Sequence, residues 1–314
     1  MRATALIGTM SLALAAGCAT VPQDATCDRD CLIDVTDAYI AALVAHDPSQ
    51  APLAADLVTV ENTARIVPGE GLWQTADAAP TTFALTIPDP VAQAAGFLGM
   101  MTVNGAPTEV ALRLQLENGE IVEAEHLVTG AITGDTLANL QTPRPGLLAE
   151  IPEGQRLRRD ELVRIAGLYY DALEGENGKL APFADDCARR ENGLQTSTDP
   201  KWEGDDTFWH RAYGCSDQLD LGVMAYIDRL DNRRVFAADP VTGLTIGLSH
   251  FRHAMTEHEF PLTGAPGGRT VRVLDLAPFD LPAAHVYKIG PDAKIHEIEA
   301  MGFLADYNSP TGWE

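Results

Sequence analysis

The chain has 314 residues and a formal net charge of −23, because 22 Lys and Arg stand against 45 Asp and Glu. This acidic excess argues against a nucleic-acid partner, since binding to DNA or RNA begins with cationic side chains on phosphates. Hydrophobic residues make up 46% of the chain, which is enough for a real core, and the length suggests two domains.

The first 17 residues are typical of an export signal. Arg2 precedes an apolar run from Ala3 to Ala16 that is too short for a membrane-spanning helix. The stretch from Leu14 to Cys18 resembles a bacterial lipoprotein signal, in which the cysteine becomes lipidated. We therefore expect a lipid on Cys18, residues 18–30 as a tether, and a location at the periplasmic face of a bacterial membrane. Cleavage and secretion without a lipid is the alternative, and the lipid would be the only membrane attachment.

Four cysteines remain after Cys18, an even number that suits an oxidising compartment. Local spacing favours the pairs Cys27–Cys31 and Cys187–Cys215. A metal site is the competing interpretation, but Cys-x3-Cys without a second Cys or His pair nearby is a weak metal signal. We expect two disulfides, no metal and no cofactor.

An internal repeat organises the rest of the chain. The blocks 38–43, 51–56 and 61–63 return at 168–173, 181–186 and 191–193, each displaced by 130 positions. A period of this length suits two whole domains rather than a solenoid. We assign residues 31–130 to the first domain, 131–158 to a linker rich in Pro and Gly, and 159–308 to the second domain.

The elements follow the same order in each half. Apolar residues at helical spacing predict a helix over 31–46 and a short element from Pro52, and alternation predicts a strand hairpin over 110–116 and 121–127. The second half predicts a helix over 160–174, a short element from Pro182, and a hairpin over 285–289 and 295–301. One opening helix followed by antiparallel strands gives an α+β fold class.

This order of elements resembles the NTF2-like superfamily, and within it an exported SnoaL-like branch. The resemblance rests on the repeated helix block, the Ala-Pro-Leu/Phe-Ala block, the Glu-Asn pairs and the stretch from Gly69 to Trp73. It implies two tandem cones, each a strongly curved antiparallel sheet capped by helices, with a pocket inside. The superfamily contains cofactor-independent isomerases, dehydratases, lyases and cyclases as well as proteins that only bind, and it has no portable catalytic signature.

Candidate site residues must therefore come from chemistry. A cofactor-free enzyme needs a proton acceptor and a donor that holds the developing negative charge. Glu61 and Glu191 lead from the helical part into the sheet, where an inward carboxylate would line a cone, and Arg189 and Arg190 can pair with Glu191. Alternatively, the Glu-Asn pair only shapes the entry to a strand.

Histidines and aromatic residues favour the second half. His250 extends the stripe Leu244, Ile246 and Leu248 and could form a pocket wall, or it is a satisfied structural residue. His250, His253 and His258 could hold a metal only on a helix, and the pattern is a strand. An insertion before Cys215 carries Trp209, His210 and Tyr213, which the disulfide would bring close to Glu191. These aromatics could instead form a small core of their own.

Two hypotheses about function follow. The first is an enzyme that transfers protons on a small hydrophobic or aromatic molecule, as a lyase, isomerase or dehydratase, with Glu191 as base and His250, His210 or Tyr213 as partner. The second is a non-catalytic lipoprotein that binds a ligand or another envelope protein. Further pocket candidates are Trp73, Arg190 and Asp239, beside Glu61 and Trp209. We expect the two halves to act as an intramolecular pseudo-dimer.

Overall fold

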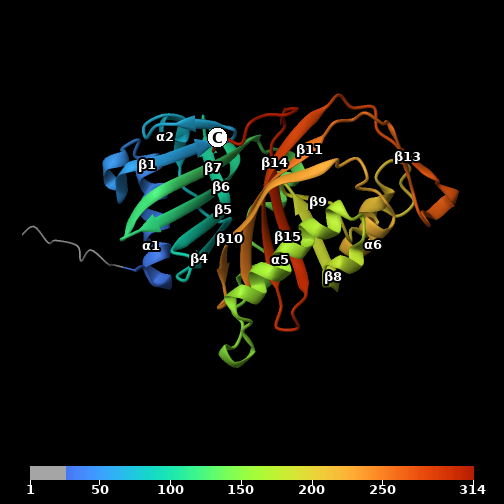
Figure 1. Ribbon diagram of the computed structural model, residues 1–314, viewed down its shortest axis with the longest axis horizontal. Coiled ribbons are helices and arrows are strands. Elements are labelled where there is room, and N and C mark those ends of the chain that lie inside the picture. The colour runs from blue at the N-terminus through green and yellow to red at the C-terminus, as the bar shows by residue number, and fades with distance from the viewer. Residues whose placement is uncertain (1–25) are drawn as a thin grey trace, which may run out of the picture.

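The computed structural model describes residues 26–314, so Cys18 and the predicted signal lie outside the described residues. Two helix-and-sheet halves stand side by side, the first coloured blue to green and the second yellow to red (Figure 1). Each half contains a seven-stranded sheet. The α+β class predicted from the sequence is confirmed.

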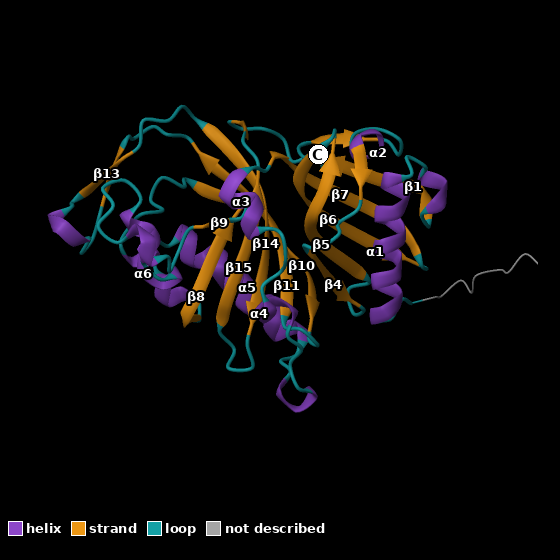
Figure 2. Cartoon of the chain, turned by 180° about the vertical axis from the view of Figure 1, so that it is seen from behind, coloured by secondary structure: helices purple, strands orange, loops and turns teal. Residues whose placement is uncertain are grey.

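Each half opens on a helix of 16 residues, as predicted: α1 (Arg29–Val44) and α5 (Arg159–Glu174). The side chain of Asp28 caps α1 by accepting a hydrogen bond from the backbone N–H of Cys31. Apolar residues at helical spacing bury one face of each helix against its own sheet (Figure 2).

The first sheet has the order β2-β1-β7-β6-β5-β3, with β4 also paired to β5. Its strands are β1 (Leu53–Glu61), β2 (Ala64–Ile66), β3 (Ala76–Ala78), β4 (Ala84–Asp89), β5 (Ala94–Val103), β6 (Ala106–Glu117) and β7 (Glu120–Ala131).

The second sheet has the order β10-β11-β14-β15-β8-β9, with β16 also paired to β14, and β12 and β13 form a separate ribbon. The strands are β8 (Phe183–Glu191), β9 (Leu194–Gln195), β10 (Arg229–Asp239), β11 (Leu244–His253), β12 (Glu259–Pro261), β13 (Val271–Val273), β14 (Phe279–Ile289), β15 (Ile295–Gly302) and β16 (Ala305–Asp306).

The predicted hairpins are present as β6–β7 and β14–β15. The sheets are mixed, however, because β1 pairs in parallel with β7 and β8 in parallel with β15. The expected short element after Pro52 and Pro182 is in fact a full strand that ends on Glu61 or Glu191. The Glu-Asn pair therefore closes the first long strand of each sheet and does not open it.

Short helices and turns complete the described chain. They are α2 (Leu72–Thr75), α3 (Gly134–Asn139), α4 (Pro145–Leu148), α6 (Cys215–Asp220), η1 (Pro48–Gln50), η2 (Glu153–Gln155), η3 (Gly178–Leu180), η4 (Pro200–Trp202), η5 (Trp209–Ala212) and η6 (Pro266–Gly268). The predicted linker holds α3 and α4, and its Arg144 pairs with Glu297 and Glu299 of β15.

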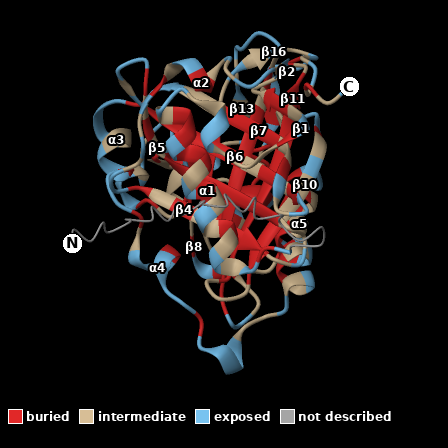
Figure 3. Cartoon of the chain, turned by 90° about the vertical axis from the view of Figure 1, so that its left-hand side faces the viewer, coloured by how far each residue is buried: buried red, intermediate tan, exposed pale blue. Residues whose placement is uncertain are grey.

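The two sheets pack face to face. Apolar side chains of β4 to β7 and of β10, β11, β14 and β15 form one shared cluster. The contact is so close that a side chain at Gly96 would collide with Ile246. Ion pairs Arg234–Glu125 and Arg159–Asp89 also join the halves. Buried residues accordingly concentrate in the strands, and exposed ones in outer helices and loops (Figure 3).

Both predicted disulfides are present, Cys27–Cys31 and Cys187–Cys215. The second bond ties the start of α6 to the middle of β8. Within residues 26–314, no helix is long and apolar enough to cross a membrane.

Candidate functional site

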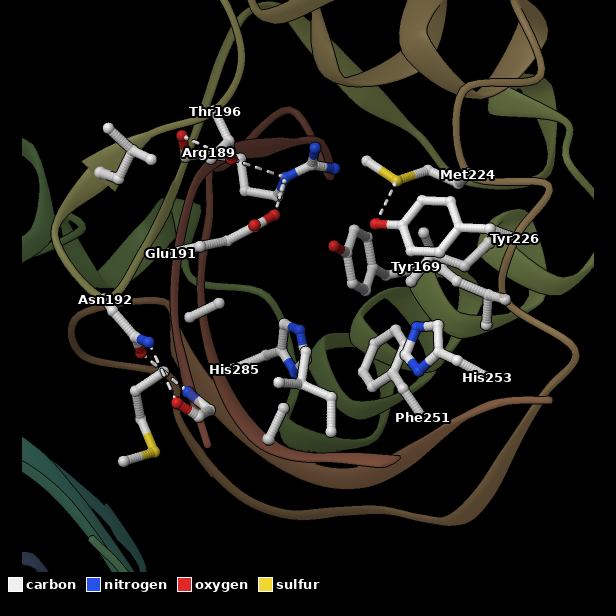
Figure 4. Close-up of a pocket in the computed structure, with 18 of the residues that line it drawn as sticks. Tyr169, Arg189, Glu191, Asn192, Thr196, Met224, Tyr226, Phe251, His253 and His285 are labelled. Atoms are coloured by element: carbon white, nitrogen blue, oxygen red, sulfur yellow. Dashed lines mark hydrogen bonds and ion pairs between the residues drawn. The ribbon is translucent and has the colours of Figure 1, made fainter. Parts of the chain in front are cut away.

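A cavity of about 270 Å³ lies in the second half, between α5, the curved sheet and the insertion that follows β9 (Figure 4). Its volume is near the lower end for small-molecule sites. Its lining combines apolar and ionisable side chains. The lining residues that matter for chemistry are Tyr169, Arg189, Glu191, Arg211, Tyr226, His253 and His285.

Glu191 and Arg189 form the charged wall of the cavity. Arg189 Nε lies 2.8 Å from Glu191 Oε1, and the Glu191 side chain is 49% exposed whereas Arg189 is 1% exposed. Arg189 also donates to the Thr196 hydroxyl at 3.1 Å and to Gln218 Oε1 at 2.6 Å. The guanidinium is thus fixed, while the carboxylate remains accessible from the cavity.

Two phenols point toward this charged wall. Tyr169 comes from α5 and Tyr226 from the loop before β10, and Figure 4 shows both hydroxyls directed toward the side of Arg189 and Glu191. Burial raises the pKa of both tyrosines, although the nearby guanidiniums oppose the shift. Both phenols therefore stay protonated at neutral pH and can donate hydrogen bonds.

Two buried histidines form the opposite side of the cavity. Burial lowers the pKa of His285 to about 3 and that of His253 to about 4, so both are neutral at physiological pH. His253 stacks on Phe279 with ring centroids 4.1 Å apart. Among the described residues, Nδ1 of each histidine lacks a hydrogen-bond partner. These rings offer an aromatic wall to a ligand, while their Nδ1 atoms are buried.

The Asn of each Glu-Asn pair has a structural role. Asn62 and Asn192 adopt positive φ, and each side chain bonds both the N–H and the C=O of a residue on the neighbouring strand, Val128 or Gly302. The Asn of each pair therefore fixes the turn at the end of the strand. Only the glutamates differ in surroundings between the two halves.

His250 lies away from the cavity. It does share a strand face with Leu244, Ile246 and Leu248 as expected, but that face packs against the first half. Its Nε2 contacts the Ser309 hydroxyl at 3.1 Å and Asp280 at 3.5 Å. Phe251 and His253 lie on the other face of β11, because side chains alternate along a strand, and they reach the cavity instead.

The aromatic insertion also differs from the expectation. Trp209, His210 and Tyr213 pack on one another beside the cavity and do not line it. Trp209 and Tyr213 line a separate surface depression. The disulfide instead anchors α6, whose Gln218 holds Arg189. The insertion thus supports the site through Arg189.

The remaining pocket candidates of the second half lie outside the cavity. Arg190 points to the other side of β8, into a surface depression that it shares with Arg144 and Glu297. Asp239, at the end of β10, pairs with Arg29 of α1 at 2.9 Å. Arg190 donates to Gln195 of β9, whereas Asp239 joins the second half to the first.

In the first half, the corresponding interior is filled. Trp73 of α2 is 1% exposed and packs edge-on against Tyr39 with ring centroids 5.2 Å apart. Glu61 accepts from the Leu72 backbone N–H at 2.7 Å and contacts His126 Nδ1 at 3.1 Å, and His126 Nε2 contacts the Tyr39 hydroxyl at 2.7 Å. Trp73 and Glu61 thus hold α2 in place as a plug.

Strand registers show how the interior changed between the halves. Glu61 lies beside His126, which lies beside Leu112; Glu191 lies beside Ala300, which lies beside His285. In the second half, the histidine is therefore one strand further from the glutamate than in the first half. Ala300 takes its place and leaves space next to Glu191. This exchange opens the cavity at the position where the first half is closed.

The sequence alone does not identify Tyr169, Tyr226 and His285 as site residues, and it suggests His253 only as a metal ligand. The 130-residue repeat aligns Tyr169 with Tyr39, which could have identified it as an inward residue of the opening helix. His253 and His285 carry no such signal. Alternation shows which residues share a face of a strand, but it does not show which face lines a cavity. Within residues 26–314, no cluster of three or more metal-ligating side chains is present.

One family model matches most of the second half. Residues 155–302 match a family model described as a domain of unknown function (DUF8021). Among curated proteins, none matches the chain.

Solved structures similar to this chain include an NTF2-like protein of unknown function from Cytophaga hutchinsonii, with 13% identity, 31% of this chain and 88% of that chain covered, and a TM-score of 0.26. A polyketide cyclase-like protein from Silicibacter sp. TM1040 has 14% identity, 46% and 91% coverage and a TM-score of 0.29. An NTF2-like protein of unknown function from Burkholderia xenovorans has 13% identity, 37% and 95% coverage and a TM-score of 0.27. Each half has an opening helix followed by a mixed sheet, which is the order of elements that the sequence predicted.

Proposed function

We propose that the second half is a cofactor-independent enzyme that transfers a proton within a small, mainly hydrophobic or aromatic molecule. One observation carries the proposal: an accessible carboxylate, a fixed guanidinium and two protonated phenols converge on one cavity. A proton acceptor beside donors for a developing oxyanion is the minimal equipment for such chemistry.

In this proposal, Glu191 removes a proton from the carbon next to a carbonyl group of the substrate. The electron pair of the broken C–H bond moves to the carbonyl oxygen, where Tyr169, Tyr226 or Arg189 donates hydrogen bonds to the enolate. Return of the proton to another carbon completes an isomerisation, and departure of a β-substituent completes a lyase or dehydratase reaction. The neutral His285 and His253 act as walls for the apolar body.

The test is turnover and thermal stability of the Glu191→Gln variant. We expect its rate with an identified apolar substrate to fall about 10²–10⁴-fold, the usual contribution of a general base. We expect Tm to stay within about 2 °C, because the side chain is half exposed and the substitution keeps its shape. An unchanged rate, or a large fall in Tm, would support a structural role for Glu191 instead.

A non-catalytic binding protein is the second candidate. The filled interior of the first half favours it, because one copy then serves as scaffold for a single receptor cavity. It predicts that lipophilic compounds raise Tm and are recovered unchanged. Recovery of a converted product would exclude this candidate.

We further propose that the protein is exported and anchored by a lipid on Cys18. The two disulfides support an oxidising compartment. Expression of Cys18→Ala in a bacterial host should move the protein from the membrane fraction to the soluble fraction. Unchanged membrane fractionation of this variant would contradict lipid anchoring at Cys18.

A further inference from the structure

We infer that the cavity selects a small organic carboxylate, with Arg211 and Arg272 at its rim as the recognition residues. The inference rests on the proposed function for the position of the ligand, and it adds the charge of that ligand. The chain carries a net charge of −23, yet three guanidiniums gather around this one cavity. Arg189 and Arg211 line it, and Arg272 lies over the ring of Tyr226, 5.0 Å from the centroid.

The two rim arginines are not neutralised. Within residues 26–314, neither Arg211 nor Arg272 has a carboxylate oxygen within 4.0 Å. Arg211 instead stacks on Phe208 and Trp202, with 4.1 and 5.1 Å from its central carbon to the ring centroids. Arg272 donates to the backbone carbonyl of Val223. Both side chains are thus held in place by uncharged partners, which leaves their charge available to a ligand.

The nearby carboxylates have other partners. Asp199 lies 3.1 Å from Lys201 Nζ, and Glu191 is paired with Arg189. Asp205 accepts hydrogen bonds from the backbone N–H groups of Thr207 and Phe208. Glu191, Asp205 and Asp199 act on Arg211 only at longer range, so neither rim arginine has a carboxylate in direct contact.

A buried histidine beside the rim responds to the same field. The pKa of His210 is lowered to about 3, first by burial and then by Arg272, Arg211 and Arg189. The three guanidiniums therefore act on one region of the insertion. An anion that enters this region gains attraction that a neutral molecule of equal shape does not.

The rest of the cavity defines the body of the ligand. Phe251, Leu281 and Ala283 give an apolar floor, and the volume of about 270 Å³ suits a single ring with a short side chain. A planar guanidinium matches a carboxylate through two parallel N–H···O bonds. Since Glu191 lies in the same cavity, a monoanion is favoured over a dianion. An arylalkyl carboxylate meets these conditions.

The experiment compares the binding of matched pairs by calorimetry, each pair being a carboxylate and its primary amide. We use 3-phenylpropionate with 3-phenylpropanamide and cyclohexylpropionate with its amide, at low and high ionic strength. We expect the carboxylate to bind about tenfold more tightly or better at low ionic strength, and the preference to shrink with added salt. Equal binding of both members of each pair, or no binding by either, overturns the inference.

The variants Arg211→Gln and Arg272→Gln locate the preference. Each should lose most of the charge preference while retaining amide binding and Tm. Arg269→Gln is the matched control, because Arg269 lies over Trp209 outside the cavity and pairs with Asp206. An equal loss in Arg269→Gln would show a diffuse field and no recognition by the rim, which also overturns the inference.

The outcomes separate the inference from the proposed function. Turnover that depends on Glu191 without any preference for carboxylates would support the proposed function and refute carboxylate recognition by Arg211 and Arg272. A carboxylate preference with turnover unaffected by Glu191→Gln would do the reverse.

Discussion

His285 illustrates how a single residue records the difference between the halves. The first half has Leu112 at the equivalent sheet position, so an apolar side chain fits this environment. His285 is 3% exposed, and its Nδ1 has no partner among the described residues. Leaving a buried polar atom of this kind without a partner costs stability.

This residue predicts a pH dependence of stability. Burial lowers the pKa of His285 to about 3, so the unfolded chain binds a proton that the folded protein refuses between about pH 6.5 and 3. Stability therefore falls as pH decreases through this window, by about 1.4 kcal/mol per pH unit for one such histidine. We expect His285→Leu to flatten the fall in the free energy of unfolding between neutral and mildly acidic pH.

Urea unfolding at neutral and at mildly acidic pH measures how steeply the free energy of unfolding falls with pH. The control is His258→Leu, on an exposed loop. An unchanged slope in His285→Leu would contradict the neutral buried state of His285.

At the scale of elements, α2 and the insertion after β9 perform opposite tasks at equivalent positions. In the first half, four helical residues insert Leu72 and Trp73 into the interior. In the second half, a longer segment anchored by Cys187–Cys215 lies at the rim and leaves the interior open. The plug explains why Glu61 and Glu191 share a sequence motif and differ in their surroundings.

Trp73→Ala tests this interpretation of α2. Removing a fully buried Trp should cost about 3–5 kcal/mol of stability by creating a cavity. We also expect the new cavity to bind small apolar probes, so that benzene or indole raises the Tm of the variant more than that of the wild type. A small loss of stability without probe binding would show that the first interior has collapsed or was never packed.

The sequence predicted the elements better than their faces. Helical spacing located α1 and α5, and alternation located the two hairpins, because both periodicities are local properties of the sequence. Alternation along the strand placed His250 correctly on the same face as Leu248. A local pattern cannot tell, however, which face of a strand meets a cavity and which meets another sheet. Glu109 shows the same limit, since alternation with Val110 and Leu112 suggests a solvent face that the second sheet in fact covers.

At the scale of the whole molecule, the contact between halves contains an acidic pair. Glu109 of β6 and Glu299 of β15 are both 0% exposed, and Arg144 donates only to Glu299 of the two. Among the described residues, neither oxygen of Glu109 has a partner. Burial and, second, the nearby Glu299 raise the pKa of Glu109 well above its usual value, so this carboxyl is protonated in the folded protein.

Glu109→Gln should therefore stabilise the protein at neutral and alkaline pH. A carboxyl whose folded pKa is raised loses stability as pH rises above its unfolded pKa of about 4.5, because the unfolded chain releases the proton first. The advantage of the glutamine variant should grow from pH 5 to pH 8 in urea unfolding. Glu117→Gln, at an exposed strand end, is the control. A destabilised variant at pH 8 would indicate an ionised and paired Glu109.

We propose that the two halves act as a covalent pseudo-dimer, supported by the shared apolar cluster between the sheets. The sequence repeat predicted two similar units, but it could not predict which face of each sheet packs against the other sheet. The residues of these strands show only ordinary alternation. Light scattering should give the mass of a single chain at micromolar concentration. An obligate homodimer would show that the sheets leave a further face unsatisfied.

We propose that acid–base chemistry belongs to the second cavity and that the first interior is scaffold. The most direct measurement is the rate at which the protein exchanges the α-protons of small aryl ketones and ketoacids for solvent deuterium, followed by NMR in wild type, Glu191→Gln and Glu61→Gln. We predict exchange by the wild type and its loss in Glu191→Gln. Glu61→Gln should keep the rate and lose about 1–3 kcal/mol of stability, since Glu61 holds α2 and His126. Exchange that survives Glu191→Gln, or disappears in a folded Glu61→Gln, would contradict the account.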